Sequence, residues 1–324
     1  MGRRRGGQDG QGDQDQRGPS PARPDHPLTL LRYGPTAPNS TLSGVDYLRW
    51  IDRPVLSKPV LIAAFEGWND AGDAASTAAR YLINRWDLTL VGDIDPEEFY
   101  DFTSTRPEVQ LDDGNRREII WPSTKLFAGT IADGDHDVLI VIGSEPQLRW
   151  RTYCAALGQV ATSQQARLCL TLGALLADVP HSRPTSIVGT AFEADVVGGV
   201  ELRPSSYEGP TGIVGVLHDS WREAGLASAS LWATVPAYVP GAASPKAALA
   251  LIERTTAMLE TSLVATDLEI ASSAYERQVS ELVAADEETS SYVASLEERY
   301  DEGPPVVPSL ESIAEEVERF LREQ

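Results

Sequence analysis

Short apolar runs alternate with stretches of helical character between residues 55 and 240, and each run ends at a glycine, a proline or a polar turn. Nearly continuous apolar runs predict strands that are buried on both faces, as in a mainly parallel sheet between two helix layers. The fold class that this pattern predicts is α/β. We expect strands at 60–65, 88–91, 138–142, 168–172, 186–188, 213–216 and 231–235.

One segment departs from this alternation. Glu108–Leu111 and Arg117–Trp121 are short strand-like runs, and Asp112-Asp113-Gly114 lies between them. The Asp-Gly pair is a favoured turn in β-hairpins. The segment therefore predicts a β-hairpin inserted into the α/β pattern.

Beyond Val239 the pattern indicates helices alone. Ser244, which precedes a proline, is placed to cap a helix that continues to about residue 263. Thr266 and Glu269 have the spacing of a capping box, with the threonine as the cap. Asp286 can cap a third helix that ends at Gly303.

Charge and composition divide the chain into three parts. We expect a disordered tail over residues 1–27, an α/β domain over 28–265 and an acidic helical extension over 266–324. Residues 260–324 hold 17 acidic residues and four arginines. Their last helix, at 310–321, has an apolar stripe that must pack on the parent domain or on a neighbouring subunit.

The 324-residue chain has a net charge of −21, which disfavours binding to nucleic acid or to an anionic membrane surface. Its longest apolar run, at 168–177, is about half the length that a membrane helix needs. Two cysteines form neither a disulfide framework nor a zinc site. We expect a cytoplasmic protein without a metal or another cofactor.

The first strand leads directly into a glycine-rich turn that precedes a helix from about Ala74 to Arg85. Such turns bind ligands in α/β proteins because helix N–H groups converge there. Gly67 and Gly72 have the spacing of a phosphate-binding loop, but Asp73 and Ala74 stand where lysine and serine or threonine are needed. Helix capping or a protein contact is favoured over nucleotide binding.

Other strands end in similar polar turns, and strand ends of a parallel sheet share one edge. Glu66 and Glu145 could therefore form an acid/base pair or bind a metal, or each could cap the helix that follows it. Capping is favoured for Glu145, while both interpretations stay open for Glu66. The candidate pocket or partner surface comprises Glu66, Gly67, Trp68, Asn69, Asp70, Gly72, Gly143, Ser144, Glu145, Pro146 and Tyr238.

No complete catalytic set is visible in the sequence. The Gly-x-Ser-x-Gly elbow is missing, and none of the four histidines is paired at the spacing of metal ligands. His181 lies between prolines in a turn, where a backbone hydrogen-bonding role is expected, and His218 is expected at a strand end. We therefore assign no catalytic residue.

Six ordered segments together resemble the PAC2 family of proteasome assembly chaperone 2-like proteins, in its actinobacterial form. They are FEGWNDAGDAA (65–75), FTSTRPEVQLDDGNRREIIWP (102–122), IGSEPQLRW (142–150), GALLADVPHSRP (173–184), YEGPTGIVGVL (207–217) and WATVPAYV with SPKAALALI (232–252). The resemblance covers about residues 55–265.

The resemblance implies an α/β fold like that of nucleoside phosphorylases and hydrolases, and a homo-oligomer. We take a trimer as the working hypothesis for its size. The resemblance also implies a non-enzymatic binding protein that assists or contacts 20S proteasome subunits, with the α-subunits as partners. One alternative is an enzyme (a hydrolase, a phosphorylase or an ATP-grasp-like carboxylate-amine ligase) that uses a strand-end pocket around Glu66, Trp68 and Glu145. Another is a self-assembling structural protein.

Overall fold

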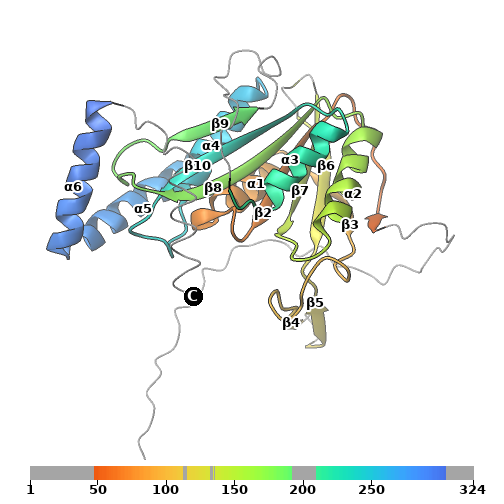
Figure 1. Cartoon of the computed structure of the whole chain (residues 1–324), viewed down its shortest axis with the longest axis horizontal. Helices are drawn as coiled ribbons and strands as arrows, with labels where there is room; N and C mark the ends of the chain where they lie inside the picture. Colours follow the sequence, from red (N-terminus) through yellow and green to blue (C-terminus); the bar gives the residue numbers. More distant parts are fainter. Residues whose placement is uncertain (1–46, 112–114, 132–133, 135, 192–208, 304–324) are drawn as a thin grey trace, which may run out of the picture. The chain divides into compact units, whose positions relative to one another are not determined.

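A single eight-stranded sheet forms the centre of the computed structural model, which describes residues 47–111, 115–131, 134, 136–191 and 209–303 (Figure 1). The strand order is β1-β3-β6-β7-β2-β8-β10-β9, and the four strands β7, β2, β8 and β10 are parallel. The flanking strands pair antiparallel. The strands of this sheet are β1 (Leu48–Trp50), β2 (Val60–Glu66), β3 (Thr89–Ile94), β6 (Thr124–Thr130), β7 (Asp137–Ser144), β8 (Leu168–Ala177), β9 (Ile187–Ala191) and β10 (Ser228–Pro236).

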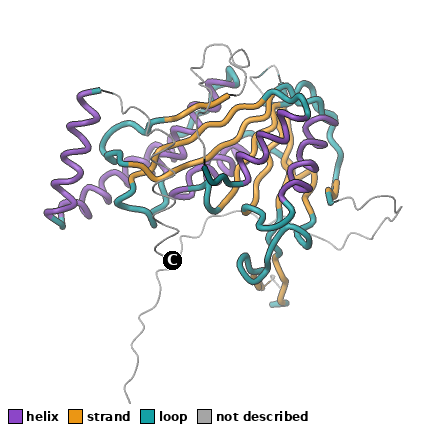
Figure 2. Tube along the Cα trace, in the orientation of Figure 1, coloured by secondary structure: helices purple, strands orange, loops and turns teal. Residues whose placement is uncertain are grey.

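Helices cover both faces of this sheet (Figure 2). In β2 the side chains of Val60, Ile62 and Ala64 pack with α1 (Ala74–Arg85) and α4 (Pro245–Met258). The alternate side chains of the same strand, from Leu61 to Phe65, pack with α2 (Trp150–Ser163) and α3 (Ile213–Glu223). Because both faces are buried, an uninterrupted apolar strand is favourable here. The α/β class with a mainly parallel sheet between helix layers is confirmed.

The predicted hairpin is present as β4 (Glu108–Leu111) and β5 (Arg117–Ile120). The two strands are antiparallel, with Val109 opposite Ile119 and Leu111 opposite Arg117. Residues 112–114, the predicted turn, lie outside the described residues. The hairpin forms a two-stranded sheet of its own.

The expected strand at 213–216 is wrong, because these residues begin helix α3. Ile213, Val214, Leu217 and Trp221 are all buried, and their spacing places them on one helical face. A four-residue apolar run cannot by itself distinguish a buried strand from a buried helix turn. His218 consequently lies on α3 rather than at a strand end.

The C-terminal helices follow the prediction in their order and differ at one cap. Ser244 caps α4 by accepting a hydrogen bond from the amide of Ala247, and Asp286 caps α6 (Glu287–Glu302) through the amide of Thr289. The capping box with Thr266 as the N-cap is wrong. Thr266 is the first residue of α5 (Thr266–Ala284), and Ala265 is its N-cap. Ala265 is buried in the core, and its carbonyl accepts the first helical hydrogen bond from Glu269. The predicted tail at 1–27 and the helix at 310–321 lie outside the described residues.

Candidate functional site

Glu66 ends the central strand β2 and is held by two side chains. Its carboxylate pairs with Arg80 of α1, and Ser144 at the end of β7 donates a hydrogen bond to Oε2 at 3.0 Å. Ser144 is also the residue paired with Glu66 in the parallel register. Glu66 is half-exposed, so the ion pair itself adds little stability, and its main effect is to connect β2, β7 and α1.

Glu145 caps a helix, but this helix is distant in the sequence. Its Oε1 accepts hydrogen bonds from the amide of Ile213, the first residue of α3, at 2.7 Å, and from Nδ2 of Asn69 at 3.0 Å. A carboxylate at a helix N-terminus satisfies one of its free N–H groups and interacts favourably with the helix dipole. The expectation that Glu145 caps the helix that follows it is wrong, because that helix, α2, has Arg149 as its N-cap. Glu145 instead caps α3, which reaches it only through the fold.

Asp70 plays the corresponding role for α1. Its Oδ1 accepts hydrogen bonds from the amides of Ala75 at 2.7 Å and Ser76 at 3.2 Å. Burial of the carboxylate raises the pKa of Asp70 to about 6, although these hydrogen bonds act in the opposite direction. Its second oxygen, Oδ2, has no hydrogen-bond partner among the described residues.

Glycines allow the turns at this edge to approach one another closely. An added Cβ at Gly212 would lie 2.7 Å from Oδ1 of Asn69 and 2.9 Å from Oε1 of Glu145. At Gly72, whose φ is +59°, it would lie 3.0 Å from Cβ of Ser244, and the amide of Ser244 donates to the Gly72 carbonyl at 2.7 Å. The turn after β2 is thus closed against the first turns of α1, α3 and α4.

Tyr238 belongs to a different group of side chains. Its hydroxyl contacts both the backbone amide of His181, at 2.7 Å, and Nδ1 of the same residue, at 2.8 Å. Nε2 of His181 lies 2.9 Å from the hydroxyl of Ser280 on α5, which donates to the carbonyl of Glu276. All the donors and acceptors in this series of hydrogen bonds are satisfied when Tyr238 donates to Nδ1 of His181 and His181 carries its proton on Nε2. Burial, together with the nearby charge of Lys246, lowers the pKa of His181 and so favours this neutral form.

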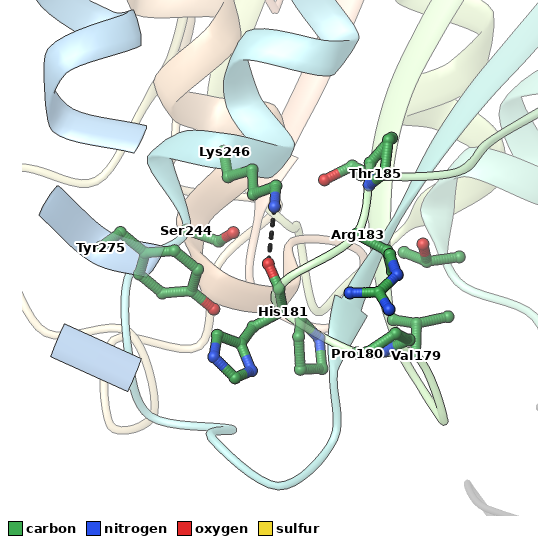
Figure 3. A pocket seen from close by; sticks show the side chains of 11 residues that line it. Val179, Pro180, His181, Arg183, Thr185, Ser244, Lys246 and Tyr275 are labelled. Atoms are coloured by element: carbon green, nitrogen blue, oxygen red, sulfur yellow. Dashed lines mark hydrogen bonds between the residues drawn. The ribbon is translucent and has the colours of Figure 1, made fainter. Parts of the chain in front are cut away.

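A small hollow lies beside this group, between the turn after β8 and the first turn of α4 (Figure 3). Lys246 points into it and donates to the His181 carbonyl at 2.6 Å and to Glu276 at 2.8 Å. Arg183 on the other side is held by both oxygens of Asp301 on α6, at 2.6 and 2.8 Å. The polar groups that line the hollow thus bind α5 and α6 to the body of the protein.

The structure brings most of the predicted residues together at one sheet edge. Hydrogen bonds link Glu66 with Ser144 and Asn69 with Glu145, and Trp68 reaches the same place beside Gly212. Gly67 lies in the same turn with a φ of +113°, and Pro146 is buried beside Glu145. Gly143 packs against the β6 backbone, where an added Cβ would lie 2.7 Å from the Ser123 carbonyl oxygen.

Sequence reasoning missed several partners of these residues. No motif in the sequence points to Arg80, Gly212 or Lys246. Arg80 pairs with Glu66, and Lys246 pairs with Glu276. Gly212 allows Glu145 to approach the start of α3. Arg80 could have been found from its position on α1, two turns after the strand-end turn. In the part of the chain that the structure describes, no group of three or more acidic, histidine or cysteine side chains is arranged to hold a metal ion. Among those residues no helix is long and apolar enough to cross a membrane.

The fold and the site define a class of protein: an α/β domain whose strand-end edge is closed by its own helix caps, with a hairpin and C-terminal helices added. Residues 64–283 match the model of the PAC2 family, so the chain belongs to the PAC2 family. The comparison with curated proteins found no match.

Solved structures agree with this family. A PAC2 family protein from Streptomyces avermitilis is 42% identical, with 72% of this chain and 99% of that chain covered and a TM-score of 0.68. A proteasome-assembly chaperone homologue from Mycobacterium tuberculosis is 40% identical, with 72% and 99% covered and a TM-score of 0.66. An archaeal proteasome activator from Pyrococcus furiosus, 16% identical with 72% and 97% covered, shares the fold at a TM-score of 0.57.

Proposed function

We propose that this protein is a non-enzymatic binding protein that assists the assembly of the 20S proteasome by contacting its α-subunits. The observation that carries the proposal is the 40% identity to the M. tuberculosis proteasome-assembly chaperone homologue, over 99% of that chain. We further propose that it acts in the cytoplasm as a homo-oligomer.

The geometry of the strand-end edge supports a binding role rather than catalysis there. A general acid or base must reach a substrate proton. Glu66 instead engages Arg80 and Ser144, and Glu145 engages Asn69 and the amide of Ile213. The two carboxylates thus join elements of the fold, which supports the binding hypothesis.

Reconstitution with purified components tests the proposal. Proteasome α-subunits from the same organism are mixed with this protein and followed by native mass spectrometry, and β-subunit precursors are then added. We expect a defined complex with α-subunits and a faster appearance of 20S particles. An unrelated protein of similar negative charge is the control for nonspecific electrostatic effects. No complex with α-subunits at tens of micromolar, together with an unchanged assembly rate, would refute the proposal.

The enzyme hypothesis has a separate test. Wild-type protein and Glu66→Gln are screened for thermal stabilisation by nucleosides, nucleotides and amino acids. We expect no ligand to stabilise the wild type in a way that depends on Glu66. A shift that is present in the wild type and lost in Glu66→Gln would place a ligand at this edge and favour the enzyme.

A further inference from the structure

Helix α6 is attached to the rest of the protein through a narrow apolar contact. Val293 and Leu296 are its two buried side chains among 16 residues. Val293 belongs to a small apolar cluster that also contains Val279 and Val283 of α5. By contrast, α5 buries five side chains, and Leu268 in its first turn is part of the main core. α5 is therefore built into the fold, whereas α6 lies on its surface (Figure 1).

The ion pairs of α6 lie on the turn after β8, at residues 178–184. Both oxygens of Asp301 accept hydrogen bonds from Arg183, at 2.6 and 2.8 Å. Glu297 lies 3.4 Å from the same arginine and accepts a hydrogen bond from Ser182. All three charged side chains are partly exposed, so salt screens these pairs and each adds little stability.

Two tyrosines of α6 add contacts to the same side of the molecule. The hydroxyl of Tyr292 donates to Oδ1 of Asp178 at 2.7 Å, and its ring stands perpendicular to that of Tyr238. The hydroxyl of Tyr300 donates to the carbonyl of Pro184 at 3.3 Å. We call the surface that α6 contacts the α6 seat; it consists of Asp178, Ser182, Arg183, Pro184, Tyr238, Val279 and Val283.

The residues of α6 that are buried or contact the seat recur at helical spacing. They stand at positions i, i+3, i+4, i+7 and i+8 of one helical face and are Val293, Leu296, Glu297, Tyr300 and Asp301. Helical peptides that dock on a protein surface use the same spacing of anchor residues. α6 thus occupies its seat in the way that a bound helical ligand does.

The extent of the family match separates α6 from its seat. The match covers residues 64–283, so the turn at 178–184 lies inside the family domain and α6 lies beyond it. Ala285 and Asp286 alone connect α6 to α5. Rotation about the backbone of this two-residue link can release α6 without disturbing the core. α6 is therefore an addition that covers part of the surface of the family domain.

We propose that the α6 seat binds an acidic amphipathic helix of a partner protein, and that α6 is the internal competitor of this helix. The partner helix repeats the face of α6, with apolar residues at i and i+3 and carboxylates at i+4 and i+8. Because both helices need the same seat, the partner binds only when α6 is released. The inference goes beyond the proposed function and does not require a proteasome subunit as the partner.

Charge favours an acidic helix over a basic one at this seat. When α6 is released, the guanidinium of Arg183 loses Asp301 and Glu297 together. A planar guanidinium is best satisfied by a carboxylate that it can bind with two parallel hydrogen bonds. Lys246 stays paired with Glu276 of α5. Two carboxylates of the partner would replace two of α6, so the charge at the seat does not change despite the net charge of −21.

The first test asks whether α6 opens while the rest of the protein stays folded. Hydrogen exchange of the full-length protein, followed by mass spectrometry, compares α6 with α4 at about 50 mM and about 1 M NaCl. We expect α6 to exchange at least about tenfold faster than α4, and salt to accelerate α6 alone. Equal protection of the two helices, or no effect of salt on α6, would overturn the proposal.

A pair of variants connects this opening to the seat. Arg183→Gln should accelerate exchange in α6 about three- to tenfold, because it removes both ion pairs of the helix. The matched control is Arg222→Gln, which removes an exposed ion pair with Asp219 on α3 and should leave α6 unchanged. Equal effects of the two variants on α6 would contradict the role of Arg183.

The second test asks whether another helix can take the place of α6. The probe is a synthetic peptide with the sequence of residues 287–302 and the change Glu297→Cys, and the protein is the full chain with Ser182→Cys, because these two residues are in contact. The matched peptide carries Glu298→Cys instead, at an exposed position of α6. The native cysteines are buried and should not react. We expect about tenfold more disulfide-linked adduct with the first peptide.

Competition is tested by weakening the chain's own α6. Glu297→Gln with Asp301→Asn, added to the Ser182→Cys protein, should raise the yield of adduct with the first peptide. Equal labelling by both peptides would overturn the proposal, because the peptide would then not occupy the seat. An unchanged yield after α6 is weakened would refute its role as a competitor. Neither test contains a proteasome subunit, so a failure of the proposed function leaves their outcome unaffected.

Discussion

The strand-end turn and the β4–β5 hairpin are both insertions between regular elements, yet they expose opposite kinds of side chain. At the strand-end edge, Asp70 caps α1, Glu145 caps α3, and Asn69 donates a hydrogen bond to Glu145. In the hairpin, Val109 and Ile119 face outward. Buried polar groups that are hydrogen-bonded specify one local structure, whereas exposed apolar groups gain free energy only when something covers them. The turn is thus held by hydrogen bonds within the fold, whereas the hairpin leaves apolar side chains exposed.

The largest expected effect concerns Asp70. Its pKa of about 6 lies above the ordinary value of 3.8, so the folded protein holds this proton more tightly than the unfolded chain. The stability that this provides is complete below about pH 4 and is lost as the pH rises through 6. Asp70→Asn removes the effect, so its stability relative to the wild type should rise by about 3 kcal/mol between pH 4 and 7. Urea unfolding of both proteins at several pH values measures this, and a constant difference would contradict it.

The next effect concerns the cap on α3. Glu145→Ala leaves the amide of Ile213 and the side-chain amide of Asn69 without their acceptor, so unfolding should cost about 2 kcal/mol less. Glu145→Gln keeps an acceptor and should recover part of this loss. Glu118→Ala on the hairpin is the control and should change stability by less than about 0.5 kcal/mol. Equal effects of Glu145→Ala and Glu118→Ala would remove the contrast between the two regions.

Effects of opposite sign are expected at two glycines. Gly212→Ala places a methyl group against Asn69 and Glu145 and should destabilise the fold by about 1–3 kcal/mol. At Gly158 of α2, nothing lies within 4 Å of an added Cβ. Gly158→Ala should therefore stabilise the helix by about 0.5–1 kcal/mol. Thermal unfolding of the two variants gives the sign of each stability change directly. Destabilisation by both would show that close packing at Gly212 does not explain the effect of an added methyl group.

The smallest effect on stability is expected for the exposed apolar face of the β4–β5 hairpin. At concentrations where the protein is monomeric, Val109→Thr with Ile119→Thr should change the unfolding free energy by less than about 0.5 kcal/mol, because both side chains are already exposed. Denaturant unfolding on diluted protein tests this. A loss of 2 kcal/mol or more in the unfolding free energy would mean that these hairpin side chains stabilise the fold of their own subunit.

The features predictable from the sequence are those determined by local chemistry. Long apolar runs predict β2 and β8, and the Asp-Gly turn predicts the hairpin. Ser244 and Asp286 predict the starts of α4 and α6. The strand predicted at Ile213 failed because a short apolar run fits two structures. The contact between Glu145 and Ile213 was not predictable either, since it depends on how α3 returns to the sheet. The burial of Asp70 likewise follows from packing that no local pattern encodes.

The sheet order has a consequence for the chain during its synthesis. The apolar part of β2, Val60–Phe65, is fully buried and emerges early, but its neighbours in the sheet begin at Asp137 and Leu168. At the usual rate of about 5–20 residues per second, the ribosome needs on the order of 10 s to deliver them. During that interval Val60–Phe65 is an apolar segment without the strands that will flank it. The position of β2 in the sheet, rather than its position in the chain, therefore determines when this segment can be buried.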